Sequence, residues 1–321
     1  MRVARGLSQY RSSPYPVVTI GNFDGHHRGH RALLQSVVET AKGKDGTPIV
    51  LTFDPHPIRV LAPHVSLQLL TTQEEKLHHF ERAGIQEVIF LTFDQALASM
   101  SPEEFALKIL RDGIGVRELF VGEHFAFGKG RSGRLADLVR LGGQAGFVVH
   151  PVHPLRIDGD VVSSTRIRKL LQAGDVRGAA RCLGRAYALG GQVMPGQQRG
   201  QALGWPTANL QLPPDRVIPA DGVYATVTLW REQRFDSVAY IGTRPTFGPG
   251  QRLLEVYLLD ERRDLYGEQI MVEFVERLRG DVMFATAEEL SARISQDVVQ
   301  AREMLQTVSD KWSPQGEPDL M

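Results

Sequence analysis

Short apolar runs and amphipathic stretches alternate along the first 150 residues. Runs rich in β-branched residues predict buried strands at 17–20, 49–53, 88–92, 119–121 and 147–149. Apolar residues at helical spacing, or residues typical of a helix start, predict helices at 31–41, 72–83, from 101 onward and at 135–141. This alternation favours a mainly parallel sheet that is covered on both faces. We therefore expect a Rossmann-like α/β domain.

The pattern changes after about residue 186. Apolar and polar residues alternate with a period of two over 222–230, and further strands are expected at 237–242, 253–259 and 269–275. Few helices interrupt them, which favours an antiparallel barrel or sandwich closed by a helix over 286–305. The chain is thus expected to divide into domains at 1–185 and 186–308, with a loose C-terminal tail at 309–321.

The composition narrows the class of protein. The 321 residues carry 37 Lys and Arg against 37 Asp and Glu, so no basic surplus exists to grip a nucleic-acid backbone. A single cysteine, Cys182, excludes an intramolecular disulfide. No apolar run reaches the roughly 18–20 residues of a membrane span, and the N-terminus lacks the apolar core of a secretory signal. We expect a soluble cytoplasmic protein without nucleic-acid, membrane or obligate protein partners.

The strongest chemical signal lies between the strand at 17–20 and the helix that follows it. Glycines at Gly21, Gly25 and Gly29 allow tight turns and the close approach of a ligand. The N-terminus of the helix offers N–H groups to an anion. His27 and His30 are three residues apart and are expected to project to one side, where two imidazoles suit phosphate chemistry. A metal-binding pair or two surface histidines are the alternatives.

A second signal precedes a helix expected over 167–172. Ser163, Ser164 and Thr165 stand at its start, where hydroxyl groups can be simple helix caps. Arg166 and Arg168 add guanidinium groups, which are well suited to clamping phosphates. We therefore expect a second phosphate-binding element at this point.

The segments of the first domain resemble a known family. The segment 21–30 is similar to the G-x-F-D-G-x-H-x-G-H signature of FMN adenylyltransferase domains, a branch of the HxGH nucleotidyltransferase superfamily. The segment 163–168 resembles the S-S-T-x-I-R motif of that superfamily. Residues 52–57 and 121–128 are similar to two further segments of this branch.

The resemblance continues into the second half. Residues 200–210 are similar to the P-T-A-N segment of riboflavin kinases, and matching segments follow at 242–246, 254–260 and 264–267. Over about residues 14–305, the chain resembles the bacterial family of bifunctional riboflavin kinase/FMN adenylyltransferases, or FAD synthetases.

This resemblance implies two reactions. Riboflavin and ATP would give FMN and ADP, and FMN with a second ATP would give FAD and pyrophosphate, with Mg²⁺ as the cofactor. One alternative is a single-activity FMN adenylyltransferase in which the barrel is kept as a flavin-binding module. Another is a non-catalytic metal or nucleotide sensor built on the histidine-rich loop.

For the kinase reaction, the resemblance implies that Thr207 and Asn209 lie near Mg²⁺ and the ATP phosphates, with Gly204 and Pro206 in the nucleotide-binding segment. It implies Glu255 as the base that takes the proton of the riboflavin hydroxyl. Strand alternation places Glu255 among apolar neighbours, and such neighbours raise the pKa of a carboxyl group and make its ionised form a better base. Without the resemblance, Glu255 would be read as an exposed strand residue, and Thr207 and Asn209 as turn residues.

For the adenylyl transfer, the resemblance implies His27, His30 and Arg168 as catalytic residues. Asp54, His56 and His124 are the expected substrate contacts, although Asp54 and His56 could also form an ordinary turn bracketed by prolines. The expected nucleotide-binding residues of this domain are Gly21, Phe23, Asp24, Gly25, Gly29, Ser163, Ser164 and Thr165.

Four residues depart from the family pattern. His124 stands where Asp or Asn is usual, and Gln201 replaces an Arg before the P-T-A-N segment. Tyr240 and Tyr257 stand where Asn and His are frequent. Because none of these is an expected catalytic group, the departures concern affinities and rates rather than the class of reaction.

Overall fold

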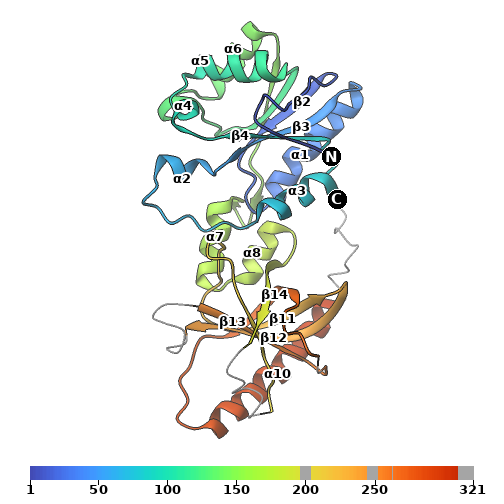
Figure 1. Ribbon diagram of the computed structural model, residues 1–321, viewed down its shortest axis with the longest axis vertical. Coiled ribbons are helices and arrows are strands. Elements are labelled where there is room, and N and C mark those ends of the chain that lie inside the picture. The colour runs from blue at the N-terminus through green and yellow to red at the C-terminus, as the bar shows by residue number, and fades with distance from the viewer. Residues whose placement is uncertain (196–203, 244–251, 262, 310–321) are drawn as a thin grey trace. The chain divides into compact units, whose positions relative to one another are not determined.

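Residues 1–195, 204–243, 252–261 and 263–309 are described by the computed structural model (Figure 1). The chain divides into two compact units between Ser164 and Thr165. A division of the two activities after residue 185 stays a prediction.

A six-stranded sheet organises the first unit, and all of its strands are parallel. Its spatial order is β1-β4-β3-β2-β5-β6. The strands are β1 (Arg2–Arg5), β2 (Pro16–Ile20), β3 (Thr47–Asp54), β4 (Glu87–Thr92), β5 (Glu118–Gly122) and β6 (Val148–Val152). The five expected strands are present. The edge strand β1 was not expected because it is short and buries only Ala4.

Helices cover both faces of this sheet, which confirms the Rossmann-like class. They are α1 (Arg28–Gly43), α2 (Pro57–Leu61), α3 (Gln73–Arg82), α4 (Gln95–Ala98), α5 (Pro102–Glu104), the π-helix η1 (Phe105–Ile114), the 3₁₀ turn η2 (Lys129–Arg131) and α6 (Leu135–Ala145). A small hairpin, β7 (Arg156–Ile157) and β8 (Asp160–Val161), follows β6. Capping boxes start α3 at Thr72 and α5 at Ser101, at the helix starts that the sequence predicts.

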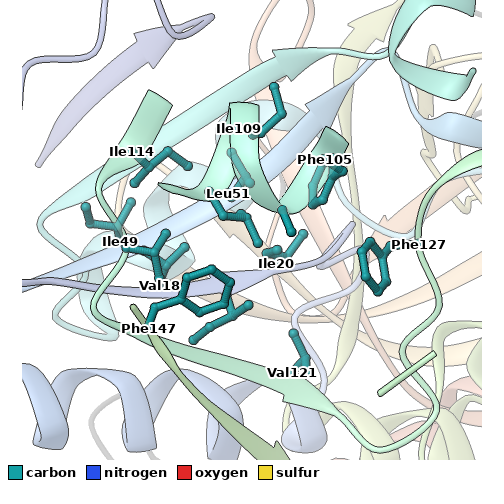
Figure 2. Close-up of a cluster of buried hydrophobic side chains, with 14 of the residues drawn as sticks. Val18, Ile20, Ile49, Leu51, Phe105, Ile109, Ile114, Val121, Phe127 and Phe147 are labelled. Atoms are coloured by element: carbon teal, nitrogen blue, oxygen red, sulfur yellow. The ribbon is translucent and has the colours of Figure 1, made fainter. Parts of the chain in front are cut away.

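Alternate residues of each strand build two apolar layers. Val18 and Ile20 of β2 point to the face covered by η1 and α6, together with Ile49 and Leu51 of β3 (Figure 2). Val17, which directly precedes Val18 and points the opposite way, packs on the other face with residues of α1 and α3. Burial on both faces explains why the central strands are continuously apolar rather than alternating.

The strand order reverses beside β2. The chain runs from β2 to β3 and β4 on one side and then returns to β5 and β6 on the other. In open parallel sheets, a crevice forms at such a reversal outside the carboxyl ends of the strands, and ligands bind there. The loop between β2 and α1 starts at this point.

The second unit contains a closed six-stranded antiparallel barrel, in the order β10-β13-β12-β11-β14-β9. This confirms the expected barrel and its closing helix. The helices of the second unit are α7 (Ser164–Ala173), α8 (Val176–Leu183) and α10 (Ala287–Ser309), and α7 begins at the last residue of the first unit. The strands of the barrel are β9 (Tyr187–Met194), β10 (Ala208–Leu210), β11 (Gly222–Trp230), β12 (Gln233–Thr243), β13 (Arg252–Leu258) and β14 (Gln269–Arg279). Strand β9 carries two glycines and β10 has three residues, so neither shows a strand pattern in the sequence.

Helix α10 packs its apolar face against the outside of the barrel. Val298, Ala301 and Leu305 contact a cluster that includes Val223 of β11 and Val238 of β12. In the part of the chain that the structure describes, no helix is long and apolar enough to cross a membrane.

Candidate functional site

The β2–α1 loop (residues 21–27) borders a pocket of about 220 Å³ at the reversal of the strand order. The pocket is lined by Ile20, Gly21, Phe23, His27, Gly29, His30, Leu33, Gly122, Val152, His153, Pro154, Leu155 and Val162. Five of the residues expected to bind nucleotide or to act in catalysis therefore surround one cavity. Asp24 and Gly25 are not among the lining residues.

His27 and His30 stack at the N-terminus of α1. Their ring centroids are 3.6 Å apart and their planes meet at 17°. His27 is the N-cap, because its Nδ1 accepts a hydrogen bond of 3.2 Å from the backbone N–H of His30. An accepting Nδ1 places the proton of the neutral ring on Nε2, which can donate to a phosphate oxygen. The buried position of His27 excludes the surface-histidine alternative for this residue.

His30 is poorly suited to carry a charge in the absence of an anion. Burial, and then the neighbouring His27, His26 and Lys76, hold the pKa of His30 well below its usual value of 6.5. Its Nδ1 is buried without a hydrogen-bond partner among the described residues. An arriving phosphate would reverse this situation, because negative charge favours the protonated ring and supplies a partner.

The lowered pKa of His30 predicts a dependence of stability on pH. An unfolded His30 binds a proton near pH 6.5, but the folded one resists it, so the unfolded state binds more protons below that pH. Stability therefore falls as the pH decreases from 6.5 toward the folded pKa, by at most about 1.4 kcal/mol per pH unit. Calorimetry should show a smaller fall in Tm between pH 7 and 5 for His30→Phe, which keeps the stack, than for the wild type. Equal falls in both proteins would contradict this assignment.

Asp24 fixes the loop rather than lining the pocket. Its carboxylate accepts hydrogen bonds of 3.0–3.1 Å from the backbone N–H groups of Leu70 and Thr71, and one of 3.1 Å from the Thr71 hydroxyl. Gly25 adopts a φ of 85° and donates its N–H to the same hydroxyl. A Cβ at Gly25 would lie 2.7 Å from Leu70, so this turn requires glycine for two reasons. A direct contact of Asp24 with nucleotide stays a prediction.

Gly29 does not form a left-handed turn, since its backbone is not left-handed, but it lines the pocket, and its expected contact with nucleotide stays a prediction. A Cβ there would lie 3.2 Å from the ring atoms Cε1 and Nδ1 of His27. Glycine at this position therefore leaves room for the capping imidazole. The turn itself depends on Gly25.

The remaining expected contacts of this unit are spread more widely. Asp54 ends β3 at the same edge of the sheet and lies 3.6 Å from Arg5, while His56 caps the short helix α2. His124 is exposed after β5. Ser164 donates a hydrogen bond of 2.8 Å to the backbone carbonyl of Asp24. Ser163 lies just before α7, and Thr165 and Arg168 belong to the second unit, so their roles stay predictions.

Sequence reasoning missed the part of the pocket that comes from β5 and β6. His153 follows β6, lines the pocket, and its Nδ1 lies 2.6 Å from a carboxylate oxygen of Glu123. A signal was present, because residues that directly follow parallel strands meet at one edge of the sheet. Without the strand order, however, nothing placed His153 beside β2.

In the barrel, strand pairing brings together two residues expected to act in the kinase reaction. Asn209 of β10 lies directly opposite Glu255 of β13, and Glu255 lies opposite Tyr240 of β12. Directly paired residues of antiparallel strands carry their side chains on one face, with Cβ atoms about 4.5–5.5 Å apart. Glu255 is only 6% exposed, so its interpretation as an exposed strand residue is wrong. Asn209 lies within a strand, so its interpretation as a turn residue is wrong as well.

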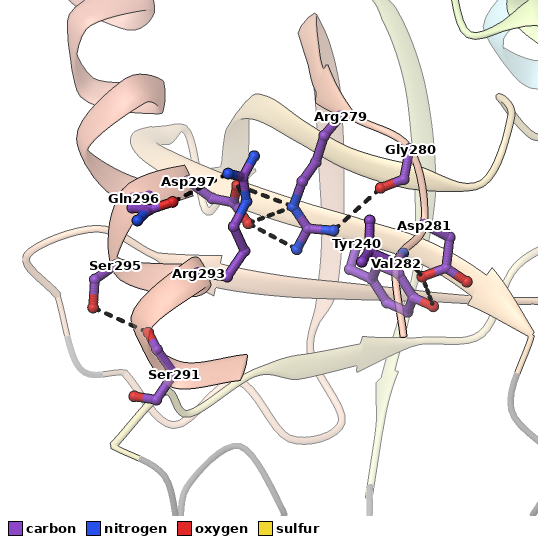
Figure 3. Close-up of polar contacts among 10 residues, drawn as sticks. All are labelled: Tyr240, Arg279, Gly280, Asp281, Val282, Ser291, Arg293, Ser295, Gln296 and Asp297. Atoms are coloured by element: carbon purple, nitrogen blue, oxygen red, sulfur yellow. Dashed lines mark hydrogen bonds and ion pairs between the residues drawn. The ribbon is translucent and has the colours of Figure 1, made fainter. Parts of the chain in front are cut away.

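The row of paired residues that contains Glu255 is attached to the segment after β14. The Tyr240 hydroxyl donates a hydrogen bond of 3.2 Å to Asp281, and burial together with Asp281 raises the pKa of Tyr240 to about 12 (Figure 3). Arg279 forms an ion pair of 2.9 Å with the buried Asp297 of α10, which Arg293 also approaches at 3.3 Å. These contacts anchor α10 beside the face that carries Glu255.

Thr207 and Asn209 fit a magnesium site by the chemistry of their donor groups. A hydroxyl and an amide oxygen are hard ligands, and Mg²⁺ in phosphoryl-transfer sites takes its other ligands from phosphates and water. Among the described residues, no group of three or more His, Cys, Asp or Glu side chains could hold a metal by itself. Gly204 and Pro206 lie in the segment that leads into β10, and Gln201 lies outside the described residues.

Two family models match the chain in the order that the sequence suggests. The model described as FAD synthetase matches residues 11–166, and the model described as riboflavin kinase matches residues 183–305. The chain is 37% identical over 306 residues to the bifunctional riboflavin kinase/FMN adenylyltransferase of Escherichia coli (strain K12), and 40% identical over 304 residues to that of Pseudomonas fluorescens. Each alignment covers 94% of this chain and 97% of the relative.

A solved structure has the same fold over nearly the whole chain. A crystal structure from Streptococcus pneumoniae, described as a macrolide-efflux protein, aligns with a TM-score of 0.85 and 27% identity. The alignment covers 98% of this chain and 100% of that one. Its description differs from the two family models, so this comparison contributes the fold alone.

Proposed function

This chain belongs to the family of bifunctional riboflavin kinase/FMN adenylyltransferases, and we infer that it catalyses both reactions. It phosphorylates riboflavin with ATP to give FMN and ADP, and it adenylylates FMN with a second ATP to give FAD and pyrophosphate. The observation that carries this conclusion is that one chain contains two candidate sites, each with side chains suited to one of the two reactions. The first unit holds the stacked histidines at a pocket, and the barrel pairs Asn209 with a buried Glu255.

In adenylyl transfer, a phosphate oxygen of FMN attacks the α-phosphorus of ATP, and the bond to pyrophosphate breaks. No covalent enzyme intermediate is required, so positioning and charge neutralisation supply the rate. His27 would donate from Nε2, the N–H groups of α1 would bind phosphate oxygens, and His30 would stabilise the departing pyrophosphate. Arg168 is proposed to add a further positive charge.

In riboflavin phosphorylation, Glu255 would take the proton of the flavin hydroxyl as that oxygen attacks the γ-phosphorus of ATP. Its position opposite Asn209 supports this role, because the base and the phosphate-binding group then lie side by side on one face. We propose that Thr207 and Asn209 hold Mg²⁺ with the ATP phosphates. When bound there, the ion would neutralise charge that develops on the transferred phosphoryl group.

Removal of divalent cations is expected to stop both reactions. In this proposal, ATP binds through its phosphates in each site. The side chains expected beside these phosphates are His27 and His30 in the first unit and Thr207 and Asn209 in the barrel, and they supply too little positive charge to neutralise the phosphates by themselves. Chelation with EDTA should reduce FMN and FAD formation by at least about a hundredfold, and added Mg²⁺ should restore both. Product chromatography checks this expectation, and FAD formation that persists in EDTA would contradict it for the first unit.

The experiment that tests the proposed function is a time course with riboflavin, excess ATP and Mg²⁺, followed by chromatography of the flavins. FMN that rises and then falls while FAD appears would establish both activities and their order. If riboflavin is inert while added FMN becomes FAD, the barrel is only a flavin-binding module. If FMN accumulates and is not converted, the first unit lacks the proposed activity.

The cellular location and the partners of the enzyme belong to the same proposal. We place the enzyme in the cytoplasm, where ATP is available, and expect it to act without nucleic-acid, membrane or obligate protein partners. The balanced charge and the single cysteine support this placement.

A further inference from the structure

We propose that Lys76 of α3 is a positioning residue for adenylyl transfer, which holds the backbone of the β2–α1 loop in its phosphate-binding conformation. The inference rests on the proposed FAD-forming reaction and concerns a residue outside the motifs described above. It is carried by the contact of the Lys76 ammonium with the Asn22 carbonyl, at 2.8 Å.

The loop needs to be held, because two of its residues adopt a backbone conformation that L-residues rarely take. Phe23 has a φ of 49° and His26 a φ of 42°, both in the left-handed region and neither a glycine. Such conformations persist where the surrounding structure fixes them, and they are concentrated at functional sites. Phe23 and His27 line the pocket, so the conformation of this loop shapes the site.

Segment 70–80 supplies the support. The Phe80 ring packs edge-on against Phe23 with centroids 5.4 Å apart, and the His79 ring stacks on His26 at 4.7 Å and 14°. These ring contacts fix the side chains of the loop. Lys76, one turn earlier on α3, acts on its main chain instead.

The direction of the Lys76 contact has a consequence for the pocket. In a planar trans peptide, the N–H points opposite to the C=O, so an Asn22 carbonyl held by α3 turns the Phe23 N–H away from α3. Helix α3 connects β3 to β4, on one side of β2, whereas the pocket residues after β5 and β6 come from the other side. The Phe23 N–H thus points away from Lys76, and its proposed role is that of an additional donor to phosphate.

The charges around Lys76 come from three elements. Asp24 of the loop and Asp54 at the end of β3 favour its ammonium form, while burial disfavours it and lowers the pKa of Lys76 overall. On α1, the charge of Lys76 helps to keep the pKa of His30 low. The ammonium donates a charge-assisted hydrogen bond to Asn22, whereas the neutral amine donates only a weaker one. Because burial lowers the pKa of Lys76, this weakening sets in at a lower pH than for an exposed lysine.

The test compares Lys76→Met, Lys76→Arg and Lys108→Met with the wild type in the full chain. Methionine keeps the apolar stem without the donor, and loss of a charged hydrogen bond is expected to lower kcat for FMN conversion to FAD by about 10- to 100-fold. Arginine keeps charge and donors, so Lys76→Arg should stay within about threefold of the wild type. Lys108 is exposed and pairs with Glu104, so Lys108→Met should be unchanged. FMN formation by the barrel serves as an internal control.

A pH profile separates positioning from simple loss of packing. FAD formation by the wild type should decline at alkaline pH as Lys76 loses its proton, and Lys76→Arg should move this decline to higher pH. If Lys76→Met does not fold, as judged by circular dichroism, the Lys76→Arg profile decides alone. Wild-type kcat in a folded Lys76→Met, or an unchanged alkaline decline in Lys76→Arg, would overturn the inference. Absence of FAD formation in the wild type would instead refute the proposed function.

Discussion

Replacement of His30 by alanine is expected to abolish FAD formation while FMN formation continues at the wild-type rate. His30 stacks on His27 at the pocket and has a buried ring nitrogen without a partner among the described residues, so its side chain is placed to meet a ligand. Removal of one preorganised donor from a charge-stabilising site lowers rates by about 10²- to 10³-fold, and loss of the stack adds disorder at His27. Separate assays with riboflavin and with FMN as the starting flavin measure the two rates.

The control for this variant is His64→Ala. His64 is an exposed histidine in the segment before α3, and its replacement should leave both rates unchanged. Loss of both activities in a folded His30→Ala protein would be incompatible with two separate sites. Retention of FAD formation would show that His30 only packs at the start of α1.

Replacement of Glu255 by alanine is expected to give the opposite result. The buried carboxylate lies between Asn209 and Tyr240 in the paired row, and no other residue in that row can accept the proton of the flavin hydroxyl at neutral pH. Tyr240 is excluded because its pKa is raised to about 12, so it stays protonated and donates to Asp281. FMN formation should fall by about 10²- to 10⁴-fold, while supplied FMN is converted to FAD normally.

Glu255→Gln refines this test, because glutamine keeps the shape and hydrogen-bonding capacity but cannot act as a base. Its FMN formation should be as low as that of Glu255→Ala. The matched control is Glu232→Gln, in the exposed turn between β11 and β12, which should leave both reactions unchanged. A Glu255→Gln variant with nearly wild-type FMN formation would exclude general-base catalysis by this residue.

Much of the fold was predictable because its strands and helix starts depend on short-range sequence patterns. Continuous apolar runs mark strands buried on both faces, and hydroxyl residues followed by glutamate mark the starts of α3 and α5. The turn at Gly25 and the side-by-side histidines also follow from local spacing. The sequence therefore determined the α/β domain, the barrel, and the existence of a histidine-bearing loop between β2 and α1.

Contacts between distant segments were not predictable in this way. The pairing of Asn209 with Glu255 depends on the register of strands β10 and β13, and β10 is too short to show a strand pattern in the sequence. His153 reaches the pocket only because β5 and β6 lie beside β2, on the side opposite to β3. Lys76 is an ordinary residue of a polar helix until α3 is packed against the β2–α1 loop.

One physical reason explains why the elements were predictable from the sequence and the contacts between distant segments were not. Periodicity and capping are set by interactions within about one helical turn or one strand, so the sequence alone determined the elements and the loop that carries the histidines. Register and strand order depend on which apolar faces pack together, and a shift of a strand by one residue would reverse the direction of every side chain. The tertiary structure alone therefore decided that Glu255 is buried opposite Asn209, and that Lys76 supports the loop beside His27.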